Sequence, residues 1–380
     1  MFVMVRQEAA LVAAVFVLLI SLGLVGGLII VAGADPPVAV WHGAPVPAVF
    51  SASPTPATTA VTLAATGDII MGDAPDRLPP EGGRGMFDAV EPLLAADLVM
   101  GNLEEPLTDE NGYVKCKPGV KGCNQFRVPP EYAAHVRDAG FDVLNLANNH
   151  SYDYGAGGYR STQRALERYG LAYTGGPNQV TVAEFDGVRV GVLGFSPYAY
   201  SNSLLNIAAA KAAVARAASQ VDLVVVQAHM GAEGPDRSHV RRGTEMFLGE
   251  NRGDPIRFSH AVIDAGADLV VGHGPHVMRA LEFYKGRLIA YSLGNFAGGA
   301  GTLRADGNLG LGAVLKVSLR RDGTWAGGEF ISTTHQGGGG LPRLDSGKRG
   351  LAAVQSLSRR DFPTTGPRFE ASGAFNPPQA

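Results

Sequence analysis

Metal-binding side chains follow several short apolar runs in this chain of 380 residues. The run 269–271 leads into His273 and His276, so that two imidazoles follow one predicted strand. Similar runs lead into His150 and His229. In open α/β folds, the carboxyl ends of the strands form the ligand site. The pattern therefore predicts a metal-assisted hydrolytic site assembled at strand ends.

Oxygen ligands follow the other predicted strands. Asp68 and Glu104 follow the first two strands, and Asn149 follows the third. Carboxylates can bridge two cations, neutral imidazoles suit Zn, Mn or Fe, and an amide oxygen is a common hard ligand. Each residue has a structural alternative: Asp68 as a turn cap, Glu104 as surface charge, and each histidine as a hydrogen-bonded core residue. Four of the nine histidines follow strands, and this repetition favours the metal site.

Two further residues have two interpretations each. Arg127 precedes a predicted helix and either binds an anionic substrate with a bidentate fork or is a surface arginine. Asn295 follows another strand and either forms hydrogen bonds near the metals or belongs to a turn. The other histidines are predicted to be structural, with His335 left ambiguous; they are His42, His135, His239 and His260.

The N-terminal segment indicates a location at the membrane. Residues 9–34 carry no charge, which is long enough to span a bilayer. We favour an uncleaved signal anchor, although Ala32-Gly33-Ala34 resembles a cleavage site. The rest of the chain is then extracytoplasmic, in a cell-membrane protein with a single span. In that oxidising environment, we expect Cys116 and Cys123 to form a disulfide rather than remain free thiols.

The net charge of −3, with both signs scattered, argues against nucleic acid as a partner. The chain divides into a cytoplasmic tip and membrane anchor (1–34), a Pro/Ala/Thr-rich linker (35–60), a folded domain (61–336) and a tail (337–380) that is irregular apart from a short helical piece near residues 351–357. Within the domain, strands and helices alternate at first, and hairpins are predicted at 181–193, 280–292 and 312–333. This order predicts a two-sheet sandwich flanked by helices.

The motifs that follow the strands resemble those of the CapA family, the membrane-anchored proteins of poly-γ-glutamate capsule synthesis. The resemblance covers roughly residues 61–296 and rests on Gly67-Asp68, Gly101-Asn102-Leu103-Glu104-Glu105-Pro106-Leu107, Asn148-Asn149-His150, His229-Met230-Gly231-Ala232-Glu233, Gly272-His273-Gly274-Pro275-His276 and Ser292-Leu293-Gly294-Asn295-Phe296. It implies a four-layer α/β/β/α sandwich of the metallophosphoesterase type, preceded by one transmembrane helix. It also implies a polyglutamate synthase or export complex in the membrane as partner, and an anionic polymer or phosphoester as substrate.

The resemblance also implies roles for the candidate residues. Glu104 would bridge two divalent metal ions of the Mn, Zn or Fe class, and His150 would act as the general acid. One metal site would be completed by Asn149, His229 and His273, and the other by Asp68 and His276.

One departure weakens the second metal site. Phosphoesterases usually begin with Asp-x-His, whereas this chain has Ile70 in place of that histidine. We therefore expect one tight and one weak metal site. Two functions stay open: a metal-dependent hydrolase or transferase, and a non-catalytic accessory or scaffold that binds the anionic polymer.

Overall fold

The computed structural model describes residues 39–41, 60–113, 115–117 and 122–379. The predicted membrane segment and His42 lie outside these residues. Within the described part of the chain, no helix is long and apolar enough to cross a membrane. The segment predicted as a linker contains a short strand, β1 (Ala39–Trp41), which pairs in parallel with β6.

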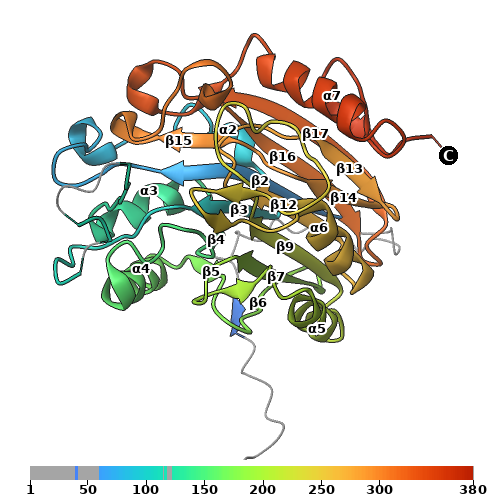
Figure 1. Ribbon diagram of the computed structural model, residues 1–380, viewed down its shortest axis with the longest axis horizontal. Helices are drawn as coiled ribbons and strands as arrows, with labels where there is room; N and C mark the ends of the chain where they lie inside the picture. The colour runs from blue at the N-terminus through green and yellow to red at the C-terminus, as the bar shows by residue number, and fades with distance from the viewer. Residues whose placement is uncertain (1–38, 42–59, 114, 118–121, 380) are drawn as a thin grey trace, which may run out of the picture. The chain divides into compact units, whose positions relative to one another are not determined.

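Two large mixed sheets make up the fold (Figure 1). The ten-stranded sheet runs in the order β19 (Arg368–Phe369), β20 (Ala374–Asn376), β17 (Trp325–Thr334), β16 (Leu311–Arg320), β2 (Ala60–Ile70), β3 (Leu98–Leu103), β4 (Val143–Asn145) and β5 (Ala172–Thr174), with β15 (Asn295–Gly298) beside β2 and β18 (Arg343–Leu344) beside β17. The eight-stranded sheet runs in the order β1, β6 (Thr181–Phe185), β7 (Val188–Ser196), β9 (Leu223–His229), β12 (Leu269–His273), β14 (Arg287–Ala290) and β13 (Leu281–Tyr284), with β8 (Asn202–Ser203) beside β7.

The sheets pack face to face, with helices on their outer faces. One buried cluster joins Leu63 of β2 to Val225 of β9 and therefore lies between the sheets. A second cluster joins the ten-stranded sheet to α3 (Ala133–Asp138) and α4 (Gly155–Arg168). A third joins the eight-stranded sheet to α5 (Ile207–Ala218) and α6 (Pro255–Asp264). The layers thus follow the order helices, sheet, sheet, helices.

Parallel pairing brings the chemically important strand ends to one edge of each sheet. The strands β2, β3, β4 and β5 pair in parallel, and so do β7, β9, β12 and β14. Neighbouring parallel strands end at the same edge, so the residues that follow them are brought together. A small hairpin, β10 (Met246–Phe247) and β11 (Glu250–Asn251), forms a separate two-stranded sheet.

Aspartates fix the opposite edge of the parallel strands. Asp97, Asp142, Asp222 and Asp268 each stand directly before a strand, and each carboxylate accepts a hydrogen bond from a backbone N–H of the neighbouring strand. The backbone N–H of each aspartate donates to the carbonyl of the same residue in the neighbouring strand. Each aspartate therefore pairs two adjacent strands where they begin.

The C-terminal segment differs from the irregular tail that we predicted. It contains α7 (Arg349–Asp361) and the strands β18, β19 and β20. Leu351 and Val354 of α7 pack into the core between the sheets, and Phe375 of β20 is buried against β17. The helix α7 covers the helical piece expected near residues 351–357. The strands were not predicted, because strands this short are stable only when they pair with a larger sheet.

Candidate metal centre

The predicted metal ligands come from both sheets and meet at their carboxyl edges. From the ten-stranded sheet come Asp68 near the end of β2, Glu104 directly after β3 and Asn149 in the loop after β4. From the eight-stranded sheet come the last residues of β9 and β12, His229 and His273, followed by His276 in the next loop.

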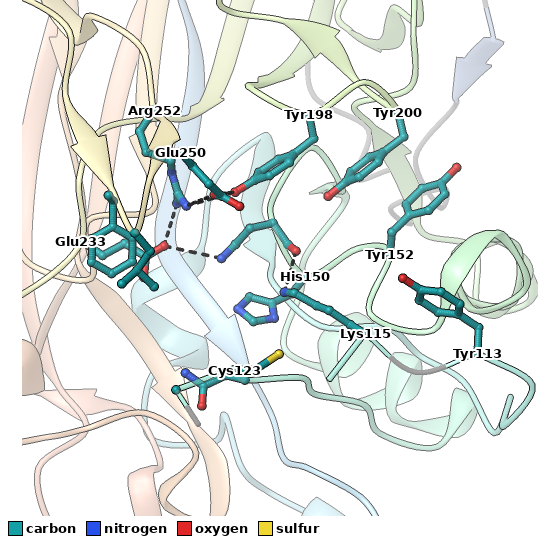
Figure 2. Close-up of a pocket in the computed structure, with 15 residues that line it drawn as sticks. Tyr113, Lys115, Cys123, His150, Tyr152, Tyr198, Tyr200, Glu233, Glu250 and Arg252 are labelled. Atoms are coloured by element: carbon teal, nitrogen blue, oxygen red, sulfur yellow. Dashed lines mark hydrogen bonds and ion pairs between the residues drawn. The ribbon is translucent and has the colours of Figure 1, made fainter. Parts of the chain in front are cut away.

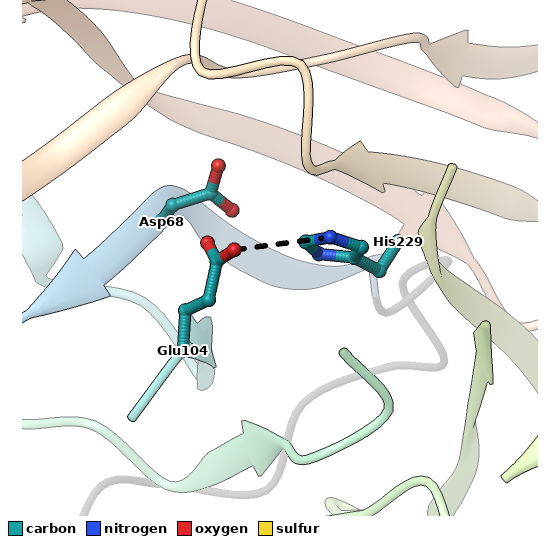
Figure 3. Close-up of side chains that lie close together, drawn as sticks. All are labelled: Asp68, Glu104 and His229. Atoms are coloured by element: carbon teal, nitrogen blue, oxygen red, sulfur yellow. Dashed lines mark ion pairs between the residues drawn. The ribbon is translucent and has the colours of Figure 1, made fainter. Parts of the chain in front are cut away.

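Three of these residues form a compact group. Asp68, Glu104 and His229 each offer a ligand atom, and these atoms lie within 4.8 Å of one another. Figure 3 shows the three side chains pointing toward a common point. All three are fully buried, so an unpaired charge in this group would be costly without a partner.

His273 and His276 lie beside the same group. His273 Nδ1 is 3.6 Å from Asp68 Oδ1, and His276 Nδ1 is 3.3 Å from Asp68 Oδ2. His276 Nε2 is 3.7 Å from Glu104 Oε1. The loop between the histidines depends on Gly274, which has φ +106° and lies so close to His229 that a Cβ would be 2.9 Å from its Nε2. A side chain at this position would therefore displace the imidazole of His229.

Four polar atoms on residues of this centre are buried without a hydrogen-bond partner in the described part of the chain. They are Glu104 Oε1, Asn149 Oδ1, His229 Nδ1 and His273 Nδ1. Leaving such a group unsatisfied costs about 1–3 kcal/mol each. In contrast, Asp68 accepts a hydrogen bond from the amide of Asn102, and His276 Nδ1 forms one with Asn295 Oδ1. The four atoms without partners, an oxygen-and-nitrogen set, match the ligand chemistry of a divalent cation.

Burial and the neighbouring charges shift the pKa values of the centre's histidines in opposite directions. Burial disfavours the protonated ring of His276, but Glu104, Asp68 and Glu233 outweigh this effect and raise its pKa to about 10. Burial also opposes ionisation of Asp68, yet contacts with His273 and His276 hold its pKa well below the usual range. Burial, together with the neighbouring Arg252, lowers the pKa of His229 well below its usual value. His229 is therefore neutral, as a metal ligand must be, whereas His276 would have to release its proton to bind a metal.

His150 is held in one orientation next to the centre. Its Nδ1 is 2.7 Å from Asp153 Oδ2, and the other oxygen of Asp153 accepts from Lys115 Nζ at 2.9 Å. The ring packs against Phe126, with centroids 4.7 Å apart. Burial lowers the pKa of His150, while Asp153 opposes this shift. Because Nδ1 is engaged, Nε2 is the nitrogen available to a ligand.

Sequence reasoning assigned no role to Asn102, which links both carboxylates. Its Nδ2 donates to Asp68 Oδ1 at 2.8 Å and lies 3.4 Å from Glu104 Oε2. Its Oδ1 accepts from the amides of Asn145 and Asn148. Asn102 belongs to the motif at residues 101–107 and stands two residues before Glu104, so its position was a usable signal.

Arg252 was missed, and Glu233 was given no role. Arg252 is 1% exposed; its Nη2 donates to Glu233 Oε1 at 2.7 Å and lies 3.1 Å from His229 Nε2. Glu233 Oε2 is 3.8 Å from His276 Nε2. Glu233 is the last residue of the motif that begins at His229, whereas Arg252 lies in a polar loop that carries no motif. Its position is decided by tertiary packing alone.

The two proposed substrate-binding residues lie in different surroundings. Asn295 Oδ1 is 2.8 Å from His276 Nδ1, which places Asn295 in the centre. Arg127 donates to the carbonyls of Ala74 and Glu110 and lies over the ring of Tyr154. The structure thus places its guanidinium in a loop network and not among the predicted ligands.

The remaining predicted features have local partners. Cys116 and Cys123 form a disulfide. Outside the centre, His135, His239, His260 and His335 each form a hydrogen bond, with Gly82, Asp361, Glu282 and Leu309, respectively. These contacts give the four histidines structural roles, including His335, which the sequence had left ambiguous.

Fold and site together define a mixed α/β protein with a candidate metal centre at its strand ends. Residues 62–300 match the family model described as bacterial capsule synthesis protein PGA_cap. The chain is 32% identical over 288 residues to the capsule biosynthesis protein CapA of Bacillus anthracis, covering 70% of this chain and 65% of that protein. It is 30% identical over 277 residues to the PGA biosynthesis protein CapA of Bacillus subtilis, covering 68% and 67%. The chain belongs to this family of capsule synthesis proteins.

Two further comparisons are more distant. A probable polyglutamine synthesis accessory protein of Mycobacterium tuberculosis is 26% identical over 228 residues, covering 53% of this chain and 55% of that protein. Among solved structures, a 5'-nucleotidase precursor from Thermus thermophilus aligns with a TM-score of 0.42 and 13% identity, covering 80% of this chain and 60% of that chain.

Proposed function

We propose that this protein is a cell-envelope accessory of poly-γ-glutamate or polyglutamine synthesis or export, with a metal-dependent, metallophosphoesterase-like site. The observation that carries the metal site is the fully buried group of Asp68, Glu104 and His229, whose ligand atoms lie within 4.8 Å of one another. The family relationship and the names of the relatives supply the polymer.

The four residues with unpartnered atoms would hold the tighter divalent cation, of the Mn, Zn or Fe class. Asp68 and His276, which already have partners, would hold a weaker one together with Glu104. When bound, such cations polarise a phosphoryl or carbonyl oxygen. Ile70 lies 0% exposed two residues after Asp68 and has no ligand atom, which supports the weaker second site.

The other residues of the centre would orient the substrate and move a proton. His150 would donate a proton from Nε2 to the leaving oxygen, while Asp153 fixes the ring through Nδ1. Asn102 would hold the carboxylates of Asp68 and Glu104 in place. Arg252 would keep Glu233 next to His276.

We further propose that residues 9–34 anchor the protein in the cell membrane and that the domain lies outside the cytoplasm. The disulfide between Cys116 and Cys123 supports an oxidising compartment. The partner would be a polyglutamate synthase or export complex in the same membrane. Cell fractionation of the full chain and of a chain lacking residues 1–34 tests the anchor: only the full chain should sediment with membranes.

The central experiment measures bound metal and hydrolysis in the same preparations. Elemental analysis of the wild type should find stoichiometric metal, which His273→Ala should lose and His135→Ala should retain. Hydrolysis of a phosphodiester or of poly-γ-glutamate should fall in His150→Ala by about 10²-fold or more. Turnover that is unchanged in His150→Ala would contradict the acid role, and absence of metal in the wild type would contradict the site.

A second candidate function is a non-catalytic accessory that binds the polymer or scaffolds the complex. The missing ligand at Ile70 favours it, because an incomplete second metal site weakens phosphoester chemistry. Bound metal without turnover on either substrate would select this candidate.

A further inference from the structure

Two cavities meet beside His150. One has a volume of about 530 Å³ and the other about 360 Å³. Asn124, His150, Glu233 and Phe247 line both of them. The two cavities therefore adjoin at His150, and each has a size typical of ligand sites; we refer to the two together as the cleft.

The larger cavity has an aromatic wall, which we call the tyrosine arm; it comprises Tyr113, Tyr152, Tyr198, Tyr200 and Leu248. Figure 2 shows its tyrosines in a row that begins near Arg252 and ends at Tyr113. The rings of Tyr152 and Tyr200 stack at 4.1 Å, and those of Tyr198 and Tyr200 at 5.6 Å. A wall fixed in this way loses little conformational entropy when a ligand binds.

The positive charges of the tyrosine arm already have partners. Lys115 pairs with Asp153 at 2.9 Å, and Arg252 pairs with Glu233 at 2.7 Å. Asp153 is fully buried and Glu233 largely so; because breaking a buried pair is expensive, these cations are not available to a ligand carboxylate. Within the described residues, this arm therefore offers aromatic and hydrogen-bonding contacts, which suit amide groups and methylenes.

The smaller cavity differs in charge, and we call it the arginine arm; it is bordered by Arg77, Arg304, His276 and Asn295. Arg77 pairs with Asp73 and Arg304 with Asp306, both at 2.8 Å, and the two arginine side chains are 47% and 71% exposed. Exposed pairs of this kind contribute only about 0–1 kcal/mol. A ligand carboxylate can therefore replace either aspartate at little cost.

We propose that this cleft binds an extended, amide-linked acidic chain across His150. The tyrosine arm would hold its amides and methylenes, and the arginine arm would hold its carboxylates. The inference rests on the proposed function for the kind of polymer, and it adds the position of the chain. Because the cleft continues on both sides of His150, an internal segment of the polymer lies at the metal centre, and not a chain end.

Binding of labelled γ-glutamate oligomers to the metal-loaded full chain tests this proposal. A long oligomer should bind more tightly than a γ-glutamyl dipeptide, because only the long one reaches both arms. The variant Tyr113→Ser/Leu248→Ser should lower affinity for the long oligomer about tenfold, and so should Arg77→Gln/Arg304→Gln. Only the arginine variant should also weaken the salt dependence of binding. These residues have high or partial exposure, so the variants should fold.

Leu344→Ser and Arg359→Gln are matched controls, since both residues are exposed and line neither cavity. Equal affinity for the long oligomer and the dipeptide would overturn the proposal, as would arm variants that behave like the controls. If a neutral polysaccharide displaces the labelled oligomer as well as unlabelled oligomer does, the assignment to an amide chain would be overturned. Metal content, measured in the same samples, separates this failure from failure of the proposed function.

Discussion

Ile70 is the residue that most limits the chemistry of the centre. It lies 0% exposed in β2, two residues after Asp68, and lines the arginine arm together with His276. An apolar side chain at this point supplies no ligand, so Asp68 and His276 share the second position only with Glu104. The weakness of the proposed second site therefore rests on one side chain.

Replacing Ile70 by histidine should strengthen the weak site. We expect Ile70→His to raise the amount of tightly bound metal per chain, since a fourth protein ligand would join Asp68, Glu104 and His276. Elemental analysis after dialysis measures the effect, and Ile70→Val is the control for the altered core volume. Equal metal content in both variants would contradict the weak-site prediction.

Asn102 is predicted to act on metal affinity without binding metal itself. Its amide holds Asp68 and Glu104 in position. Asn102→Ala should therefore weaken metal binding by about 10–100-fold, the usual effect of losing a residue that orients a ligand. Metal titration measures the affinity. Asn308→Ala serves as control because that amide bonds Pro235 and Ser238 and none of the predicted metal ligands. Equal losses in both variants would argue against an orienting role of Asn102.

At the scale of the strands, the aspartates that precede them join neighbouring strands at the edge opposite the site. Asp142 precedes β4 and accepts from Val99 N–H of β3 at 2.8 Å. Burial raises the pKa of its carboxyl to about 6, although the Val99 hydrogen bond acts against this shift. The same carboxyl therefore fixes strand pairing through its hydrogen bond and, because it is buried, makes stability depend on pH.

The sign of this pH dependence can be predicted. Because the folded-state pKa of Asp142 is raised, the folded chain holds its proton more tightly than the unfolded chain. The resulting stability is fully present below about pH 4 and is lost as pH rises through about 6, on the order of 2–3 kcal/mol.

Denaturant unfolding across this range measures the effect. Asp142→Asn keeps an oxygen for Val99 but cannot ionise, so its stability relative to wild type should increase as pH rises from about 4 to 7. Asp142→Ala should lose about 1–3 kcal/mol, because Val99 N–H loses its acceptor. The exposed Asp138→Asn is the control; parallel pH curves for wild type and Asp142→Asn would refute the assignment.

At the scale of the whole molecule, the metal centre lies where the two sheets meet. Asp68 and Glu104 come from the ten-stranded sheet, and His229, His273 and His276 come from the eight-stranded sheet. A cation bound there would link both sheets, so binding should stabilise the folded state as a unit.

Metal should therefore raise the melting temperature of the domain. Free metal at about 100 times its Kd should add roughly 2.7 kcal/mol to the free energy of unfolding. Calorimetry with and without a chelator measures the shift, which His273→Ala should abolish and His135→Ala should retain. A chelator-insensitive melting temperature in the metal-loaded wild type would contradict a cation that joins the sheets.

The local pattern of the chain was enough to predict much of the fold. Apolar runs followed by His, Asp or Asn predicted β2, β3, β4, β9 and β12, and turn residues predicted the hairpins β6–β7, β13–β14 and β16–β17. These features depend on residues close in sequence, so they can be read without the tertiary structure. Residues of the candidate centre could be predicted because they directly follow these strands, and neighbouring parallel strands end at one edge of the sheet.

Tertiary structure alone decided the position of Arg252 against His229, the packing of the C-terminal α7 and β20, and the joining of two cavities at His150. Each depends on contacts between segments far apart in the chain, whose free energy comes from burial and not from local propensity. The sequence by itself determined which residues stand at the strand ends. The packing of one sheet on the other determined which of them meet, what charge surrounds them, and how a ligand reaches them.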